Sequence, residues 1–474
     1  MNVLFATSEC YPFASSGGLG DVSSALPKSL NQNGVDCRVV MPLYGDIKQE
    51  YRSKMKYVTN FKVPLAWREQ YCGLFTYCRE GVEYYFLDNE QYFKRNGLYG
   101  YYDDGERFAF LSRAILEMIK YIDFEPEIIH TNDWQTALVD VYINKFYRDI
   151  PKFYGIKTLI TIHNIQYQGK YGTDILKDVV GIDEGDAAVL EYGGCINFLK
   201  GAIESADKVN TVSPTYATEI LDPWFAHGLD DILRAKQFKL CGILNGIDVD
   251  AYNPETDPYI AANYSVDAPE NKAACKKALL EAFNLEPNDQ PIIGIVSRLV
   301  AHKGIDLVKH VLEYILLAGI KVVVLGSGEY MYENCFLDFE ARFPKMCGVK
   351  IGFIPELARK IYAGADMFLM PSKSEPCGLS QMIALRYGTL PIVRVTGGLK
   401  DSVTDSGDGE GNGFTFKSYN AHDMLDACLR ARAVYEHPDD WNVLIKRALA
   451  CDFSWSEAAK SYIGLYTEMI GLWK

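Results

Sequence analysis

Apolar runs of strand length, rich in β-branched residues, alternate with amphipathic segments of helix length along most of the chain. Because a strand of a parallel sheet is buried on both faces, such runs predict parallel strands with helices between them. The first half of the chain predicts strands at residues 3–6, 35–41, 128–130, 158–163 and 208–212. The second half predicts strands at residues 292–296, 321–325, 349–353, 367–370 and 390–393. This pattern indicates the α/β class.

The two series of strands are separated by the turn Asn245-Gly246 and by a polar, proline-containing stretch that runs to about residue 289. A chain of 474 residues is also too long for one ordinary domain. We therefore expect two domains, residues 1–245 and 246–452, each built on its own parallel sheet. Open α/β sheets bind ligands at the carboxyl ends of their strands, so two facing sheets predict an active site in a central cleft.

Composition and charge narrow the class of protein. Hydrophobic residues make up 48% of the chain and charged residues 23%, which is typical of a folded globular protein. The net charge of −14 argues against a nucleic-acid partner or a membrane-surface partner, because either would need a basic face. An anionic ligand would therefore have to meet cations placed locally in its site.

The spacing of the cysteines and the first residues of the chain lead to two further expectations. The twelve cysteines show no C-x-x-C spacing, and H-E-x-x-H is absent, so we expect no metal site. The acidic pairs Asp103-Asp104 and Asp248-Val249-Asp250 could suggest a metal–diphosphate site, but isolated pairs are usually solvated turns. The chain has no signal-like start and no apolar run of about 18 residues, so we expect a cytoplasmic protein with free thiols.

Two related glycine-rich loops follow predicted strands, Ser15-Ser16-Gly17-Gly18-Leu19-Gly20-Asp21 and Thr396-Gly397-Gly398-Leu399-Lys400-Asp401. Glycines at a helix N-terminus let backbone N–H groups approach a phosphate or sugar oxygen. The G-x-G-x-x-G spacing is missing, which argues against a dinucleotide site. The alternative is an ordinary glycine-rich turn. As a pair, one loop would hold a leaving diphosphate and the other the sugar or the acceptor.

Two cations and a carboxylate follow strands of the second half. Arg298 and Lys303 come just after the strand at residues 292–296, where they would neutralise a departing diphosphate; the alternative is a solvated basic turn. Glu375 follows the strand at residues 367–370 and could stabilise positive charge at an anomeric carbon, or simply cap a helix. Cys377 is expected to be a free thiol and not a nucleophile, because no paired histidine lies nearby in the sequence.

Polar residues also follow two strands of the first half. His163 ends one predicted strand, and the stretch from His130 through Asp133 to Gln135 ends another. Side chains at such positions are typical ligand contacts, although a single histidine is as often a satisfied core or capping residue.

Taken together, collinear motifs along the whole chain resemble the bacterial glycogen synthase and starch synthase family, retaining glucosyltransferases of the GT-B two-domain type. The motifs are Gly17-Gly18-Leu19-Gly20-Asp21-Val22, His163-Asn164-Ile165, Leu244-Asn245-Gly246-Ile247-Asp248, Ser297-Arg298-Leu299, Glu375-Pro376-Cys377-Gly378-Leu379, Thr396-Gly397-Gly398-Leu399 and Phe453-Ser454-Trp455. The resemblance implies two Rossmann-like domains, with a C-terminal helix (residues 453–474) crossing back to complete the first. It also implies transfer of glucose from ADP-glucose to the non-reducing end of an α-1,4-glucan, with no metal or cofactor.

The resemblance also implies roles for individual residues. Arg298 and Lys303 would hold the diphosphate, Glu375 would contact the glucose, and His163 would lie near the anomeric carbon. Donor or acceptor contacts are expected from Ser15, Gly17, Gly18, Asp21, Asp133, Asn245, Cys377, Gly378, Leu379, Thr396, Gly397, Gly398 and Leu399.

The chain departs from the family pattern at two positions. The first glycine loop of the family reads K-x-G-G-L, and Ser15 stands here in place of the lysine; Gln135 replaces a histidine that often follows the Asp-Trp pair. The loss of a cation leaves two alternatives open. One is a catalytically weakened glucan-binding or regulatory paralogue, and the other is a GT-B glucosyltransferase that uses UDP-glucose or another acceptor.

Overall fold

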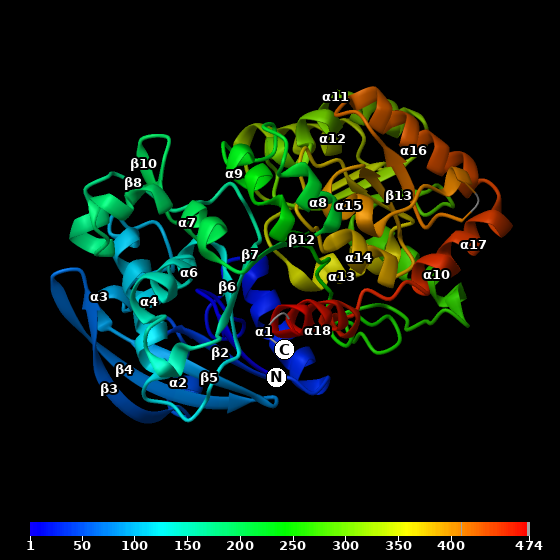
Figure 1. Ribbon diagram of the computed structural model, residues 1–474. Coiled ribbons are helices and arrows are strands. Elements are labelled where there is room, and N and C mark those ends of the chain that lie inside the picture. Colours follow the sequence, from blue (N-terminus) through cyan, green and yellow to red (C-terminus); the bar gives the residue numbers. More distant parts are fainter. Residues whose placement is uncertain (409, 472–474) are drawn as a thin grey trace. The chain divides into compact units, whose positions relative to one another are not determined.

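The computed structural model describes residues 1–408 and 410–471, which form two compact units (Figure 1). Unit 1 comprises Met1–Ile243 together with the last helix, α18 (Trp455–Gly471). Unit 2 comprises Leu244–Ser454. Of the predicted C-terminal segment, residues 472–474 lie outside the described residues.

Unit 1 is built on a nine-stranded sheet in the order β12-β11-β7-β6-β1-β2-β5-β4-β3. From β12 to β5 neighbouring strands are parallel, and β4 and β3 add an antiparallel extension. The strands are β1 (Asn2–Ala6), β2 (Asp36–Pro42), β3 (Lys56–Leu65), β4 (Arg68–Arg79), β5 (Val82–Asp88), β6 (Ile128–Asn132), β7 (Lys157–Ile162), β11 (Lys208–Thr211) and β12 (Leu240–Gly242). A small separate sheet contains β8 (Lys170–Tyr171), β10 (Cys195–Asn197) and β9 (Glu191–Tyr192).

The sequence pattern did not predict the antiparallel extension or the neighbouring strand β5. Strand β3 is exposed over its first half and alternates between exposed and buried positions over its second. A strand with one solvent-exposed face alternates between apolar and polar residues and has no continuous apolar run. A prediction based on such runs therefore does not find it.

The helices of unit 1 include α18, which packs against α1 (Gly18–Gln32). Two buried tyrosines of α18 reach the sheet: the Tyr466 hydroxyl lies 2.7 Å from Nδ1 of His130, and the Tyr462 hydroxyl accepts from Asn210. His130 is therefore a core residue, and burial lowers its pKa to about 3. The other helices are α2 (Gln49–Arg52), α3 (Glu90–Phe93), α4 (Asp104–Ile119), α5 (Asp133–Thr136), α6 (Leu138–Tyr142), α7 (Phe198–Ser205), α8 (Pro214–Glu219) and α9 (Asp230–Ala235).

Unit 2 is built on a six-stranded parallel sheet in the order β15-β14-β13-β16-β17-β18. Its strands are β13 (Ile292–Val296), β14 (Lys321–Gly326), β15 (Cys347–Ile351), β16 (Met367–Met370), β17 (Leu390–Arg394) and β18 (Phe414–Phe416). Strand β15 begins and ends two residues before the predicted range, which leaves Phe353 exposed beyond the sheet.

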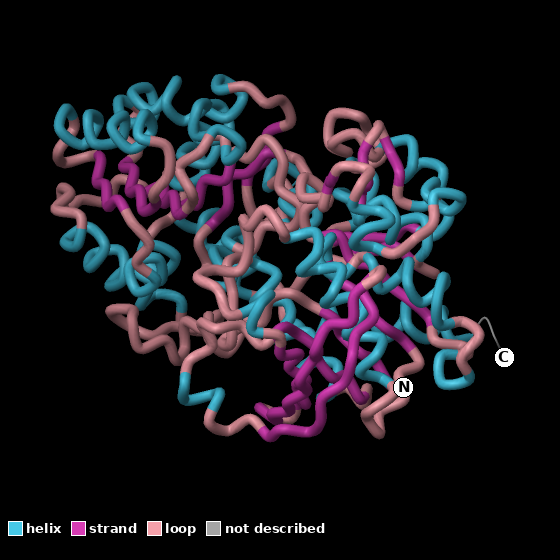
Figure 2. Tube along the Cα trace, turned by 90° about the vertical axis from the view of Figure 1, so that its left-hand side faces the viewer, coloured by secondary structure: helices cyan, strands magenta, loops and turns pink. Residues whose placement is uncertain are grey.

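Helices cover both faces of this sheet, and Figure 2 shows strands lying between helices. The alternation of side chains along β13 explains the two layers, because successive residues point to opposite faces. Ile293 and Ile295 pack with one set of helices, and Ile292 packs with the other. The first set includes α11 (Ile305–Leu317), α12 (Tyr330–Arg342), α16 (Ala421–Tyr435) and α17 (Pro438–Leu449), and the second contains α10 (Lys272–Ala282) and α13 (Pro355–Gly364).

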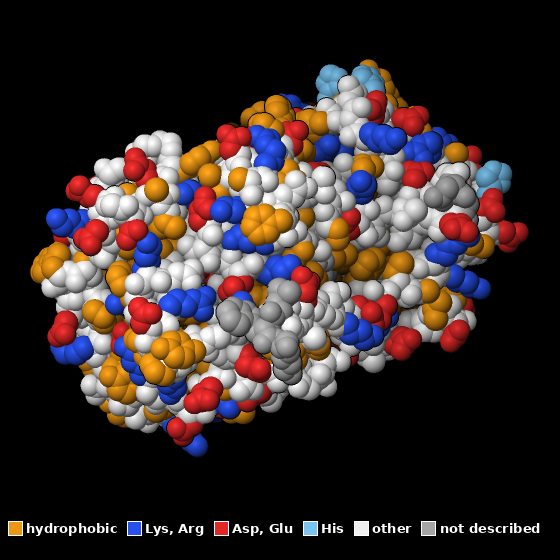
Figure 3. Space-filling model, in the orientation of Figure 1, with side chains coloured by type: hydrophobic (Ala, Val, Ile, Leu, Met, Phe, Trp, Pro, Cys, Tyr) orange, Lys and Arg blue, Asp and Glu red, His pale blue; other side chains and the backbone are white. Residues whose placement is uncertain are grey.

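The distribution of charged side chains on the surface agrees with the composition of a folded globular protein. Lysines and arginines are interspersed with acidic side chains over the face shown in Figure 3. None of the helices in the described ranges is long and apolar enough to cross a membrane.

Candidate active site

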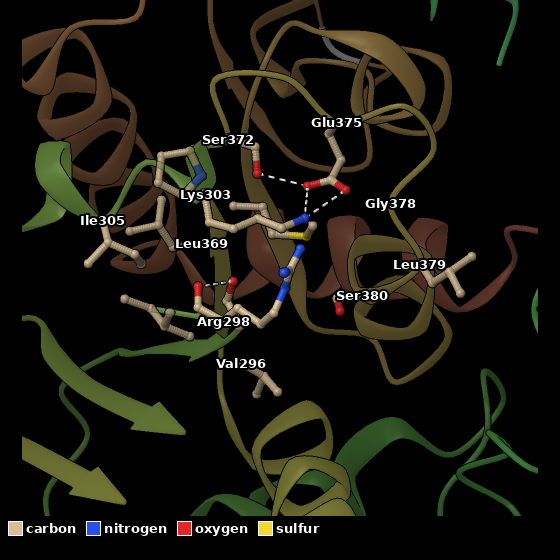
Figure 4. A pocket seen from close by; sticks show the side chains of 14 residues that line it. Val296, Arg298, Lys303, Ile305, Leu369, Ser372, Glu375, Gly378, Leu379 and Ser380 are labelled. Atoms are coloured by element: carbon tan, nitrogen blue, oxygen red, sulfur yellow. Dashed lines mark hydrogen bonds and ion pairs between the residues drawn. The ribbon is translucent and has the colours of Figure 1, made fainter. Parts of the chain in front are cut away.

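The strand order of unit 2 creates a binding position at its carboxyl edge. The chain leaves β13 toward β14 on one side, whereas β16 and β17 lie on the other, so the loops after β13 and β16 diverge. A pocket of about 210 Å³ opens between these loops (Figure 4). It is lined by Ile295, Val296, Ser297, Arg298, Lys303, Ile305, Leu369, Met370, Pro371, Ser372, Glu375, Gly378, Leu379 and Ser380.

An ion pair crosses this pocket. The ammonium of Lys303 lies 2.7 and 2.9 Å from the two carboxylate oxygens of Glu375. The Ser372 hydroxyl donates to the same carboxylate at 2.8 Å. Glu375 is only 6% exposed, so the pair is largely shielded from water and its attraction is stronger than that of a surface pair. The structure thus brings together Lys303 and Glu375, which lie far apart in the sequence.

Arg298 supplies a second cation at the same pocket. Its side chain is exposed and points toward the Lys303 side of the pocket in Figure 4. The guanidinium lies 3.5 Å from Nε2 of His302, and burial together with Lys303 and Arg298 lowers the pKa of His302. A neutral His302 adds no positive charge beside Arg298, and the exposed guanidinium of Arg298 can meet an anion from solvent.

A glycine lets the Lys303 turn approach the next loop. Gly304 follows Lys303 with φ of 77°, and a Cβ there would lie 2.1 Å from the Pro371 carbonyl oxygen. Only glycine fits both the left-handed backbone and this close contact. The sequence Lys303-Gly304 therefore brings the turn against the loop that carries Glu375.

The Gly-Gly-Leu loop of unit 2 packs beneath the Glu375 loop. It starts α15 (Gly397–Ser402), and Thr396 and Leu399 are fully buried. A Cβ on Gly397 would lie 1.9 Å from the Glu375 carbonyl oxygen, and one on Gly398 would lie 2.0 Å from that of Cys377. The Gly398 N–H donates to the Glu375 carbonyl at 3.1 Å. The glycines thus support the backbone of residues 375–377, and the predicted phosphate contact from this loop stays a prediction.

Cys377 and Asn245 meet next to the pocket. Burial raises the pKa of the Cys377 thiol to about 12, and the backbone N–H of Asn245 bonds to its sulfur. The thiol is therefore neutral near pH 7. The carboxamide oxygen of Asn245 is buried without a hydrogen-bond partner among the described residues. Gly378 and Leu379 line the pocket just before α14 (Ser380–Arg386).

In unit 1 the first glycine loop is held by a carboxylate. Glu9 follows β1 and is 4% exposed. It accepts from the Ser16 N–H at 2.5 Å, the Ser16 hydroxyl at 2.8 Å and the Gly17 N–H at 3.3 Å. The Tyr99 hydroxyl donates to it at 2.6 Å. Two N–H groups of the loop are therefore engaged within unit 1.

The remaining predicted residues of this loop face solvent. Ser15, Gly17, Gly18 and Asp21 are exposed. The Ser15 hydroxyl donates to the Gly17 carbonyl at 3.3 Å, so the side chain at the usual lysine position lies along its own loop.

Asp133 and His163 meet at the carboxyl ends of β6 and β7. The Asp133 carboxylate accepts from the His163 N–H at 2.7 Å, and burial raises its pKa to about 7. Its backbone is left-handed, with φ of 54°, a strain that proteins concentrate at functional sites. Asn132 donates its amide to the Ala6 carbonyl, which turns its oxygen toward His163.

The charge state of His163 follows from these contacts. Its Nε2 lies 2.9 Å from the Asn132 oxygen, and burial lowers its pKa to about 3. The ring is therefore neutral near pH 7, with its proton on Nε2 and a lone pair on Nδ1.

Three of the four acidic residues considered as metal ligands have other partners. Asp103 pairs with Arg95 at 2.6 Å and Asp104 with Arg107 at 2.5 Å. Asp248 accepts from backbone N–H groups of its own turn. Within the described ranges no cluster of His, Cys, Asp and Glu side chains is arranged to hold a metal ion.

Sequence reasoning missed Glu9, Tyr99 and Ser372. Glu9 had a usable signal, because it lies three residues after the first strand of the sheet. The other two act through contacts between distant segments, which spacing along the chain does not reveal.

Comparisons with known proteins identify the family of the chain. The family "Starch synthase catalytic domain" matches residues 2–235, and "Glycosyl transferases group 1" matches residues 277–442. A glycogen synthase of Geobacillus thermodenitrificans is 49% identical over 475 residues, covering 99% of this chain and 98% of the relative. One of Clostridium acetobutylicum is 49% identical over 478 residues, covering 99% and 100%.

A solved structure is similar along nearly its whole length. The catalytic domain of starch synthase IV from Arabidopsis thaliana, bound to ADP and acarbose, superposes with a TM-score of 0.89 at 33% identity and 99% coverage of both chains. The predicted α/β class and GT-B fold are confirmed. The chain belongs to the bacterial glycogen synthase and starch synthase family and is a glycosyltransferase.

Proposed function

We propose that the protein transfers glucose from ADP-glucose to the non-reducing end of an α-1,4-glucan with retention of configuration. The observation that carries the proposal is the pocket of unit 2, where Arg298, Lys303 and Glu375 converge at the carboxyl edge of the sheet. The ADP bound to the related starch synthase supports the choice of nucleotide.

The pocket fits part of such a donor. Its volume of about 210 Å³ is below the roughly 300–1,000 Å³ of whole-ligand sites. We therefore assign the glucosyl diphosphate to it and leave the nucleoside outside. Arg298 and Lys303 would take up the negative charge that grows on the diphosphate as the glucosyl bond breaks. Glu375, paired with Lys303, would face the glucose and balance positive charge at the anomeric carbon.

Unit 1 would supply the groups for the sugar and the acceptor. Neutral His163 offers hydrogen bonds without adding a charge that would repel an oxocarbenium-like carbon. We assign Asp21 and Asp133 to sugar and acceptor hydroxyls. We assign Asn245 of unit 2 to the same hydroxyls, because its buried carboxamide oxygen accepts no hydrogen bond from the described residues. We also propose that Ser15, Gly17 and Gly18 contact the donor or the acceptor.

The direct test measures glucose incorporation into glycogen with ADP-glucose and UDP-glucose in parallel. We expect turnover with ADP-glucose to exceed that with UDP-glucose, and proton NMR of an extended oligosaccharide to show a new α-1,4 linkage. Incorporation from neither donor would favour a glucan-binding protein without transferase activity. A preference for UDP-glucose would show that the proposed donor is wrong.

Variants of the two cations test the assignment of the pocket. Arg298→Ala and Lys303→Ala should each lower kcat by about 100- to 1,000-fold, because each removes a charge that stabilises the transition state. Their thermal unfolding should stay close to that of the parent. Turnover within a few-fold of the parent would show that the diphosphate lies elsewhere.

We also propose a cytoplasmic location. The twelve cysteines are unpaired in the structure, which supports a reducing compartment.

A further inference from the structure

The reacting charges of the unit 2 pocket are carried by two separate loops. Lys303 lies on the turn after β13, residues 301–304, and Glu375 on the loop after β16, residues 371–376. One backbone bond joins the loops directly, from the Lys373 N–H to the His302 carbonyl at 2.9 Å. The distance between Lys303 and Glu375 depends on how firmly each loop is held.

Arg394 holds the Glu375 loop. It ends β17 and is 9% exposed. Its Nε donates to the Ser372 carbonyl at 2.9 Å, and its Nη2 donates to the Lys373 carbonyl. A planar guanidinium that bridges two successive carbonyl oxygens fixes the path of the chain between them.

Tyr419 holds the Lys303 turn. It lies between β18 and α16, and its hydroxyl shares its proton between two acceptors. These are the carboxylate of Asp306 at 2.5 Å and the carbonyl of Ala301 at 3.1 Å. Asp306 belongs to the first turn of α11, so the turn that carries Lys303 is tied to the start of that helix.

The two supports meet at the Tyr419 ring. The guanidinium carbon of Arg394 lies 5.9 Å from the ring centroid, and the Lys373 ammonium lies 6.0 Å from it. Cations at this distance from an aromatic face are weakly attracted to it. Arg394 and Tyr419 thus pack together with Lys373, which itself belongs to the Glu375 loop.

We propose that Tyr419 and Arg394 are positioning residues that set the spacing between Lys303 and Glu375. Neither side chain is among the described residues that line the pocket, so both act through the residues they hold. The inference rests on the proposed function, because it assigns these residues to the same glucosyl transfer. Misplacement of reacting groups by about 1 Å can cost about 100-fold in rate, so loss of one support should be visible in kcat.

The test compares two tyrosine variants of the same unit. Tyr419→Phe keeps the ring and removes the hydroxyl, and we expect kcat to fall about tenfold while the KM for glycogen is unchanged. Tyr435→Phe is the matched control. The Tyr435 hydroxyl also donates to a backbone carbonyl, that of Asp289 at 3.0 Å, and it accepts from Lys276, away from the pocket. We expect the control to lose stability to a similar degree and to keep its kcat.

A double-mutant cycle separates positioning from general loosening. If Tyr419 acts through Lys303, Tyr419→Phe should cost less than about twofold when Lys303→Ala is already present. Amide exchange should also quicken at Lys373 in Tyr419→Phe and not in Tyr435→Phe. An equal cost in both backgrounds, or a control variant as slow as Tyr419→Phe, would overturn the inference.

Arg394→Lys carries the same test for the second support and replaces Tyr419→Phe if that variant is too unstable to assay. It keeps the positive charge but loses the pair of N–H donors that bridges the two carbonyl oxygens, and we expect kcat to fall about three- to tenfold. A parent enzyme that transfers no glucose would refute the proposed function. An active parent with fully active Tyr419→Phe and Arg394→Lys would refute the positioning role alone.

Discussion

The Gly-Gly-Leu loop of unit 1 is exposed at both glycines, whereas that of unit 2 is buried at both. A Cβ on Gly17 or Gly18 would meet nothing within 4 Å, but one on Gly397 or Gly398 would overlap a carbonyl oxygen. The first loop is held by the charge of Glu9, and the second is held by backbone contact. The same Gly-Gly-Leu sequence therefore serves two physical purposes. It leaves the backbone accessible to solvent in unit 1, and it allows close packing of the backbone in unit 2.

Among changes to the two glycine loops, the largest effect is expected from Gly397→Ala. Its φ of 44° disfavours any side chain, and the new Cβ would displace the Glu375 backbone. We expect the free energy of unfolding to fall by about 2–3 kcal/mol and kcat by about 100-fold. Thermal unfolding and glycogen-elongation kinetics measure both. A variant with the stability and kcat of the parent would show that the second loop is not close-packed, and the contrast with unit 1 would disappear.

An intermediate effect is expected from Glu9→Gln. The amide places an N–H group where a carboxylate oxygen now accepts, so at least one donor of the first loop loses its partner. We expect kcat to fall about tenfold with a small change in thermal stability. Ser16→Ala removes a single contact of the same carboxylate and serves as a milder control. If Glu9→Gln matches the parent, the first loop does not depend on charge for its shape.

A several-fold effect is expected from Ser15→Lys, which returns a cation to the first loop. A partly exposed charge is worth about 1 kcal/mol, so the KM for the donor or kcat should shift several-fold. Kinetics with ADP-glucose and UDP-glucose in parallel would measure the shift. Unchanged constants in a folded variant would mean that position 15 points away from the substrates.

The smallest effect is expected from Gly17→Ala, the counterpart of Gly397→Ala. Gly17 has φ of −169°, which any residue adopts, and open space around it. We expect thermal unfolding to stay close to that of the parent and kcat to change by less than about twofold, because a Cβ leaves in place the backbone groups that would make the proposed contact of Gly17. A loss as large as that of Gly397→Ala would reveal a need for bare backbone at this position, such as close approach of a ligand.

The sequence predicted most of the buried strands, because their apolar runs depend only on local composition, but it did not predict β5 or β18. It placed Arg298, Lys303 and Glu375 after the strands whose loops form one pocket. It could not predict the Lys303–Glu375 ion pair or the Glu9 contacts, which arise only when distant loops meet. Nor could it separate the two glycine loops, because their difference lies in what surrounds them. His130 shows the same limit, since only the fold distinguishes a core histidine from a ligand.

Helix α18 determines when unit 1 can be completed during synthesis. The sheet of unit 1 is encoded before Leu244, yet the tyrosines that satisfy His130 and Asn210 come after Ser454. At about 5–20 residues per second, the ribosome needs roughly ten to forty seconds to make unit 2 in between. During that interval two polar side chains of the nascent sheet lack their final partners. Unit 1 is therefore completed only after α18 has been made, although its sheet is synthesised first.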